Sequence, residues 1–311
     1  MTQPPEWPWL IDLYFFLGGI AGASYVLAAI ADNFGSAEDR GMVRIGYLLA
    51  FAIAPIIALI LIVDLGMPQR FFHMLWVPKP STAIGEGAIN ILGFHFKPYS
   101  PMSVGAWGLG IFGAFAAAGA YLSWNERPDS VGLRRTLGLF GGLFAFFLAA
   151  YTGQLISATA QPLWMDSRLG GALFLVVAAS GAGAALALIL QLREGGPART
   201  LAKLRRTYTW CLILQAVVLA AYLWNVSGGT PKTARALQLL LSGSYALPFW
   251  GGAVILGLAV PLILEFRDGF PGGYRQPAGA TLTAAAILIL LGGFLTKFLI
   301  FAAGQALGVT A

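Results

Sequence analysis

The stretch LILIVDLGMPQRFFH, residues 59–73, places a carboxylate at the end of an unbroken apolar run. Asp64 comes just before Gly66 and Pro68, two residue types at which helices commonly end. Arg70 and one of the chain's two histidines follow within ten residues. Ionisable residues inside a membrane are costly and are by default functional candidates. The stretch therefore predicts the end of a membrane-spanning helix that carries a candidate functional acid.

The composition of the whole chain points to the same environment. Of its 311 residues, 58% are hydrophobic and only 10% are charged, and the mean hydropathy is +0.76. A soluble domain has about 25% charged residues. Because lipid cannot satisfy open backbone groups, helices of about 20 apolar residues must cross the bilayer. The short alternating segments of an outer-membrane barrel, about 10 residues each, are absent.

Apolar runs bounded by charged residues, proline and glycine predict an all-α polytopic membrane protein. We expect one integral membrane domain, residues 1–311, with eight transmembrane helices in two four-helix bundles. The predicted helices span residues 9–31, 43–66, 103–124, 133–158, 169–192, 206–226, 246–266 and 280–307. An even number of spans puts both termini on one side of the membrane.

Lysine and arginine are unevenly divided between the two sides. The connections after the odd-numbered spans hold twelve: Arg40, Arg44, Arg127, Arg134, Arg135, Arg193, Arg199, Lys203, Arg205, Arg206, Arg267 and Arg275. The connections on the other side hold six: Arg70, Lys79, Lys97, Arg168, Lys232 and Arg235. The positive-inside rule therefore predicts that both termini are periplasmic in a bacterial inner membrane. The formal charge of +6 reflects this orientation and not nucleic-acid binding.

Two further features of the ends and connections matter. The N-terminus has no basic segment, which predicts an uncleaved first helix instead of a signal peptide. The connection over residues 67–102, on the outer side, is longer than the roughly 12–15 residues of ordinary loops. Its many aromatic residues predict a partly structured cap or docking surface. His73 and His95 lie in it and could be ordinary side chains of the membrane interface.

The few polar side chains within the predicted spans that are functional candidates fall in the outer leaflet. They come from four helices and are Asp12, Asp64, Tyr151, Gln154 and Lys297. His73, in the outer connection, is close to Asp64 in sequence. Structural explanations stay open for several of them. Asp64 could accept a backbone N–H in the turn DLGMP, Tyr151 could belong to an aromatic belt, and Asp12 could neutralise Lys297.

The residue types exclude several cofactors. Haem inside the bilayer needs histidine on the spans, and no predicted span contains one. Cys211 is the single cysteine, which excludes an iron–sulfur cluster held by this chain, and clustered metal ligands are missing. A quinone fits the polar set, because its carbonyls need donors such as Tyr151, Gln154, Lys297 or His73. Its conversion moves two protons, which Asp12 or Asp64 could relay.

Several strings of the sequence are similar to one known family. They are WPWLIDLYFFLGGIAGASY (7–25), DLGMPQRFFHML (64–75), SPMSVGAWGL (100–109), YTGQLISATAQPLW (151–164) and GGFLTKFLIFAAGQ (292–305). In this order they resemble the NrfD/PsrC family, the membrane subunits of polysulphide-reductase-like molybdenum enzymes. The resemblance implies an eight-helix, haem-free subunit that oxidises or reduces quinone. It also implies a ferredoxin-like iron–sulfur subunit and a molybdopterin catalytic subunit on the outer face.

The resemblance also implies roles for individual residues. Tyr14 occupies a position where some members have a quinone-contacting histidine, Tyr151 corresponds to a tyrosine at the site, and Asp64 is the acid of the DLG motif. Met67 departs from the family's frequent DLGRP. Lys297 stands where the family has an arginine, whose bidentate geometry a lysine cannot reproduce.

The leading hypothesis is a quinone-reactive membrane anchor of a respiratory oxidoreductase, using menaquinone or ubiquinone. Asp12, Tyr14, Tyr151 and Gln154 would form the head-group site, with Lys297 as a further donor. Asp64 and His73 would carry protons. The alternatives are an ion-coupled transporter, which would bind its substrate and protons at the same charged groups, and a purely structural anchor. The terminal substrate belongs to another subunit in the leading hypothesis, so this sequence does not identify it.

Overall fold

The computed structural model describes residues 7–76, 88–125, 127–159, 161–194, 197–267 and 279–306. Within these ranges, eight helices are long and apolar enough to cross a membrane, which confirms the predicted all-α polytopic fold. Lys79 and Arg275 of the charge count, residues 77–87 of the outer connection and Leu307 at the end of the last predicted helix lie outside the described residues.

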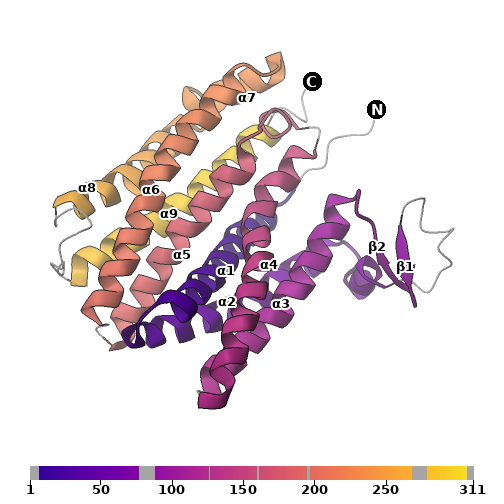
Figure 1. The fold of residues 1–311 in the computed structure, drawn as a ribbon. Coiled ribbons are helices and arrows are strands. Elements are labelled where there is room, and N and C mark those ends of the chain that lie inside the picture. The colour runs from indigo at the N-terminus through magenta and orange to yellow at the C-terminus, as the bar shows by residue number, and fades with distance from the viewer. Residues whose placement is uncertain are drawn as a thin grey trace.

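The helices follow the apolar runs closely (Figure 1). Their bounds are α1 Trp9–Phe34, α2 Arg40–Asp64, α3 Pro101–Asn125, α4 Val131–Ser157, α5 Gly170–Glu194, α6 Ala198–Ser227, α7 Pro231–Leu241, α8 Val260–Arg267 and α9 Gly279–Gln305. The π-helix η5, Pro248–Ala259, runs directly into α8, so the two together form the seventh span. Shorter 3-10 helices are η1 Ala37–Asp39, η2 Pro68–Met74 and η4 Pro128–Ser130.

The largest difference from the predicted bounds concerns α6, which begins at Ala198 and not at residue 206. The prediction began where the apolar run begins, but lysine and arginine are good helix formers and only end the membrane-embedded part. The extra turns at the start of α6 bind the connection between α1 and α2. Lys203 Nζ lies 2.6 Å from Asp39 Oδ2, and the hydroxyl of Thr200 donates to Asp39 Oδ1 at 2.8 Å. α7 was not predicted as a separate helix, and it begins at Pro231, with Thr230 as its N-cap.

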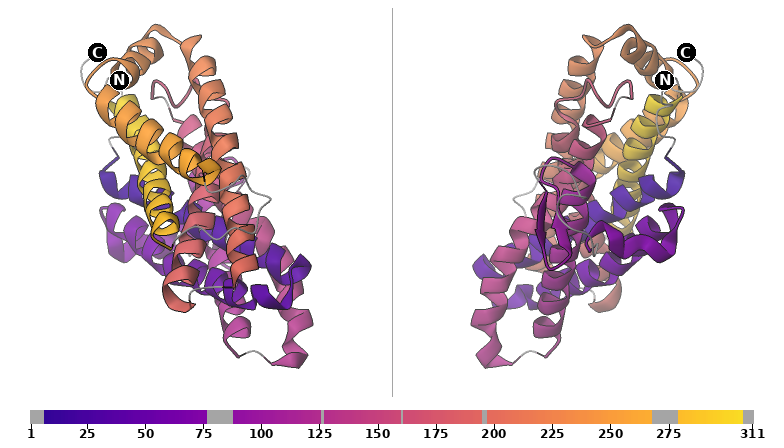
Figure 2. Two further views of the ribbon diagram at one scale, coloured as in Figure 1. Left: turned by 90° about the vertical axis from the view of Figure 1, so that its left-hand side faces the viewer. Right: turned by 90° about the vertical axis from the view of Figure 1, so that its right-hand side faces the viewer.

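The helices form two groups that meet along α1, α4 and α5. α1–α4 contact one another, while α5, α6, η5 with α8, and α9 form the second group. η5 and α9 pack closely at Gly257 and Gly292, where an added Cβ on Gly257 would lie 2.3 Å from the Cα of Gly292. α1 begins and α9 ends at the same end of the molecule (Figures 1 and 2), which we call the outer end.

A small cap covers the outer ends of α2 and α3. It consists of η2 and the antiparallel hairpin β1 (Ile89–Ile91) and β2 (Phe94–Phe96), so the predicted all-α fold has this one addition among the described residues. The backbone N–H of His95 donates to the carbonyl of Leu75 at 3.0 Å, and Trp107 Nε1 of α3 donates to the carbonyl of His95 at 2.8 Å. These bonds fasten the hairpin to η2 and to α3. Burial, with Lys97 nearby, lowers the pKa of His95 below its ordinary value of 6.5.

The connection between α4 and α5 closes the outer end of the second group. Trp164 is fully buried, and its indole N–H donates to the carbonyl of Ile300 at 3.0 Å. Asp166 accepts hydrogen bonds from the Thr233 hydroxyl and the Thr230 backbone N–H, which hold the first turn of α7 and lower the pKa of the Asp166 carboxyl. The buried tryptophan and this carboxylate therefore fix the connection without a disulfide.

Candidate functional site

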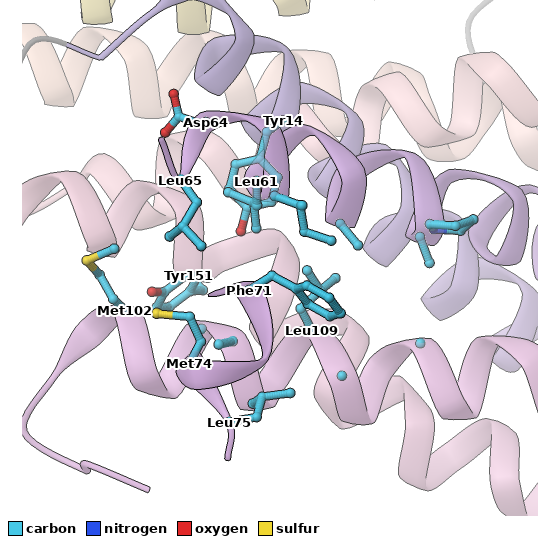
Figure 3. A pocket seen from close by; sticks show the side chains of 18 of the residues that line it. Tyr14, Leu61, Asp64, Leu65, Phe71, Met74, Leu75, Met102, Leu109 and Tyr151 are labelled. Carbon is cyan, nitrogen blue, oxygen red and sulfur yellow. The ribbon is translucent and has the colours of Figure 1, made fainter. Parts of the chain in front are cut away.

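A cavity of about 590 Å³ lies at the outer end of the first group of helices. Its walls come from α2 and α3, η2 covers it, and α1 and α4 contribute one and two residues (Figure 3). The lining is almost entirely apolar, and three polar side chains among its residues stand out: Tyr14, Asp64 and Tyr151. A large apolar pocket with a few convergent polar groups is the usual form of a small-molecule site.

The cavity lies between α2 and α3, on the outer side of a contact between these two helices. At Gly119, nearer the inner end, an added Cβ would lie 2.9 Å from Tyr47 Cδ1, so the helices touch there. At Gly110 and Gly113, an added Cβ would meet no atom within 4 Å. Gly110 and Gly113 therefore leave open space in the lining of the cavity. We call the part lined by Phe51, Pro55, Ala58, Ala106, Gly110 and Gly113 the α2–α3 groove.

The two tyrosines present hydroxyl groups to the outer part of the cavity from different helices (Figure 3). Tyr151 of α4 is 7% exposed and donates its proton to the carbonyl of Pro101 at the start of α3. Gly105 makes room for this ring, since a Cβ there would lie 2.3 Å from the Tyr151 oxygen. Tyr14 of α1 is 4% exposed, and within the described residues its hydroxyl has no hydrogen-bond partner. Tyr14 is thus an available donor, and Tyr151 an available acceptor.

Asp64 lies at the rim of the cavity, as the last residue of α2 (Figure 3). It is exposed, and no backbone N–H of the described residues donates to its carboxylate, so it does not cap the turn that follows. The helix ends instead through Gly66, whose φ of +71° is readily adopted only by glycine. The carboxylate is therefore free to exchange protons with its surroundings.

The cover over the cavity comes from η2. Phe71, Met74 and Leu75 line the side toward the outer end, and Met102 adds to it from the start of α3 (Figure 3). Leu75 is the residue to which the hairpin is bonded. The cap thus separates the tyrosines from the outer surface, and the hydrogen bond from the hairpin to Leu75 helps to hold η2 over the cavity.

Two other predicted site residues lie outside the cavity lining. Gln154 is exposed and faces the start of α5, where its Oε1 would be 3.8 Å from a Cβ built on Gly171. His73 lies in η2, is exposed, and has its ring 4.4 Å from that of Phe72. His73 is therefore on the outer side of the same short helix that covers the cavity, but it does not reach into it.

Asp12 and Lys297 are both buried, at 4% and 0% exposure, and neither lines the cavity. Asp12 is two residues from Tyr14, and residues two apart lie on opposite sides of a helix. Its Oδ1 has no hydrogen-bond partner among the described residues. Lys297 Nζ donates to the carbonyl of Phe15 at 3.0 Å and lies 4.8 Å from the ring centre of Phe174. The described residues contain no ion pair between Asp12 and Lys297, so the two do not neutralise each other.

The sequence interpretation missed the residues that shape the cavity. They are the glycines of α3 and the apolar side chains of η2, of which Gly105, Gly110, Gly113, Phe71 and Met74 matter most. The spacing of glycines in GAWGLGIFG, residues 105–113, was the available signal. Glycine-rich helix faces are usually interpreted as close contacts, and only the neighbouring helix shows that this one borders empty space.

The arrangement suits an amphipathic, uncharged ligand. A single donor and a single acceptor face a long apolar wall, and a carboxylate stands at the rim. Within the described residues, no group of three or more His, Cys, Asp or Glu side chains is placed to hold a metal ion.

Comparisons with known proteins agree over nearly the whole sequence. A family model described as "Polysulphide reductase, NrfD" matches residues 1–309. The C subunit of polysulfide reductase from Wolinella succinogenes is 26% identical, with 96% of this protein and 94% of the relative aligned. Protein NrfD of Escherichia coli is 27% identical, with 96% and 95% aligned. A homolog of NrfD from Haemophilus influenzae is 24% identical, with 96% and 94% aligned.

Proposed function

Because the protein belongs to the polysulphide reductase NrfD family, we propose that it is the quinone-reactive, haem-free membrane subunit of a respiratory oxidoreductase complex. The observation that carries the proposal is the apolar cavity with the hydroxyls of Tyr14 and Tyr151 at its outer end. A quinone, menaquinone or ubiquinone, supplies two-electron, two-proton chemistry when it is bound. The side chains of the cavity bind and orient its ring and exchange protons with it.

Tyr14 and Tyr151 are suited to orient a quinone ring between them. The free hydroxyl of Tyr14 can donate to a ring oxygen. Tyr151 can accept from a quinol hydroxyl while its own O–H donates to the Pro101 carbonyl. Burial of both rings keeps water away from the reacting oxygens, which strengthens each hydrogen bond. The two residues therefore hold the ring and distinguish its two oxygens.

Asp64 is suited to pass protons between the ring and the outer aqueous phase. It is exposed at the rim, and its carboxylate has no competing hydrogen bond within the described residues. His73 lies on the outer side of η2, nine residues on, and would be the next group on the way out. For Asp12, Gln154 and Lys297, which lie outside the lining, contact with the ring would require side chains or helices to move.

The electrons would pass to partner subunits on the outer side. We propose a ferredoxin-like iron–sulfur subunit there, followed by a molybdopterin catalytic subunit, with both termini of this protein in the periplasm. One relative is named as a lettered subunit of polysulfide reductase, which supports membership in such a multi-subunit enzyme. The single cysteine of the sequence supports the view that the clusters belong to a partner.

The test uses the complex purified from native membranes. We expect iron, molybdenum and extractable quinone to accompany the protein, and the complex to oxidise or reduce added quinone. Ala106→Phe places a ring in the cavity, and we expect it to lose bound quinone and quinone-linked turnover while dye-linked turnover remains. Ala114→Phe is the matched control, because Ala114 is exposed on the same helix and does not line the cavity.

Two results would overturn the proposal. One is a wild-type complex that neither contains nor reacts with quinone, and the absence of all redox components would favour a transporter instead. The other is an Ala106→Phe complex with normal quinone content and turnover.

A further inference from the structure

The α2–α3 groove continues from the tyrosines toward the centre of the bilayer. On α2 the lining runs from Asp64 back to Phe51, a distance of about 20 Å at 1.5 Å per residue. Beyond Asp64, this wall carries apolar side chains only. A quinone ring bound at Tyr14 would cover only the outer part of this wall, so the cavity is longer than the ring requires.

The groove opens sideways to the membrane. Phe51, Pro55 and Gly110 are exposed on the lipid-facing surface, whereas Tyr14 and Tyr151 at the other end are buried. On the outer side, η2 covers the cavity with Phe71, Met74 and Leu75. A ligand that fills the cavity therefore has its polar end enclosed and its apolar end in contact with lipid.

The floor of the groove is made by missing side chains. Gly110 and Gly113, one turn apart on α3, face open space, and Ala58 of α2 lines the same cavity. A leucine at either glycine would project into this space. Inward of the lining, α2 and α3 are in contact at Tyr47 and Gly119, and the groove is closed there. Its inner limit is thus set by helix contact, and its width by the two glycines.

We propose that the α2–α3 groove binds the isoprenoid tail and is the lateral entrance from the bilayer, and that Gly110 and Gly113 set its preference for long-tailed quinones. The inference rests on the proposed quinone function and adds which part of the molecule this surface selects. Apolar burial of a chain along this wall stabilises the complex through the hydrophobic effect. A quinone without the tail makes the same contacts at the tyrosines but leaves the groove empty.

The test compares two quinols with one head group, one with a long polyisoprenyl tail and one with a methyl group in place of the tail. Both are assayed in the same proteoliposomes with the wild-type complex and with Gly110→Leu and Gly113→Leu. We expect KM for the long-tailed quinol to rise about tenfold or more and KM for the quinol without a tail to change less than about twofold. Ala58→Phe, from the opposite wall, should reproduce the effect if either leucine variant fails to assemble.

Gly142→Leu is the control, because Gly142 of α4 also faces open space but lies outside the cavity lining. Dye-linked turnover should stay unchanged in all variants and reports their assembly. Equal losses with both quinols, or no loss with either, would overturn the groove as a tail site while the wild type remains active. A wild type inactive with both quinols would overturn the quinone function itself.

Discussion

The ammonium nitrogen of Lys297 on α9 lies 3.0 Å from the carbonyl oxygen of Phe15 on α1, and no carboxylate forms an ion pair with it among the described residues. Gly19 provides the space, since a Cβ there would be 2.9 Å from the nitrogen. The lysine thus links α1 to α9 directly behind Tyr14, which faces the cavity from the neighbouring position. In this position Lys297 would affect a bound quinone only by positioning α1, and with it Tyr14.

We expect Lys297→Met to fold as well as the wild type or better. An unpaired buried ammonium costs free energy because it has lost its hydration, and an apolar side chain of similar length removes this cost. Because Lys297 is outside the cavity lining, KM for quinol should stay within about twofold. Thermal unfolding can be followed by labelling of Cys211, the single cysteine, which is half-buried in α6. Lys232→Met, at an exposed lysine of α7, is the control. A tenfold rise in KM would show that the lysine reaches the substrate.

Tyr14→Phe should weaken the reaction with quinol without harming the fold. The variant removes the hydroxyl in the cavity that has no partner among the described residues, and a lost hydrogen bond of about 1–3 kcal/mol lowers kcat/KM by about five- to 150-fold. Tyr121→Phe, at an exposed tyrosine near the inner end of α3, should change nothing. Steady-state kinetics with quinol and with a dye separate the two effects. Unchanged kcat/KM for quinol in Tyr14→Phe would exclude Tyr14 from the head-group site.

Asp64→Asn should sharply lower quinone-linked turnover and leave dye-linked turnover intact. Asparagine keeps the size of the side chain but cannot take up and release a proton. Asp129→Asn, at an exposed carboxylate of the inner connection, should behave as the wild type. Equal loss in both assays, or no loss in either, would remove Asp64 from proton transfer.

The stability of the cap should depend on pH through His95. Its pKa is lower in the folded hairpin than its ordinary value of 6.5, so the folded cap favours the neutral ring. The contribution is complete above about pH 7 and is lost as pH falls through 6.5, because the opened hairpin takes up the proton first. Hydrogen exchange of the β1 and β2 amides, corrected for the intrinsic rate, should therefore speed up between pH 8 and pH 5.

The first turn of α7 is an internal control for this measurement. The pKa of Asp166 is lowered by its hydrogen bonds, so this carboxylate stays ionised over the same pH range and local exchange should not change. His95→Gln should make exchange in the hairpin independent of pH. Equal protection of the hairpin at pH 5 and pH 8 in the wild type would contradict the role of His95.

The prediction of the spans succeeded because one physical constraint dominates. A backbone in lipid must be helical, so the apolar runs predicted the eight spans to within a few residues at most ends. It failed where lipid is not the solvent. The charged start of α6, the separate helix α7 and the hairpin of the cap lie at the aqueous ends, where hydropathy carries little information. The resemblance to the NrfD/PsrC family, taken from five strings, is confirmed by the match over residues 1–309.

The candidate site was predictable only in part. Tyr14, Tyr151 and Asp64 do meet at one cavity, whereas Asp12, Gln154, His73 and Lys297 lie around it. Gln154 is three residues from Tyr151, a rotation of about 60° around α4, and this suffices to turn it toward α5. Which side of a helix faces a neighbour is decided by contacts such as Gly119 with Tyr47, and these depend on residues far apart in the sequence.

The sequence by itself determined that this protein spans a membrane eight times and where its polar residues stand along the membrane normal. That follows from the cost of exposing peptide groups and charges to lipid, which depends on depth alone. Only the tertiary structure decided which of those residues share a cavity and that the cavity extends into a groove over Gly110 and Gly113. Rotation and packing of helices are set by side-chain contacts between them, and no apolar run contains that information.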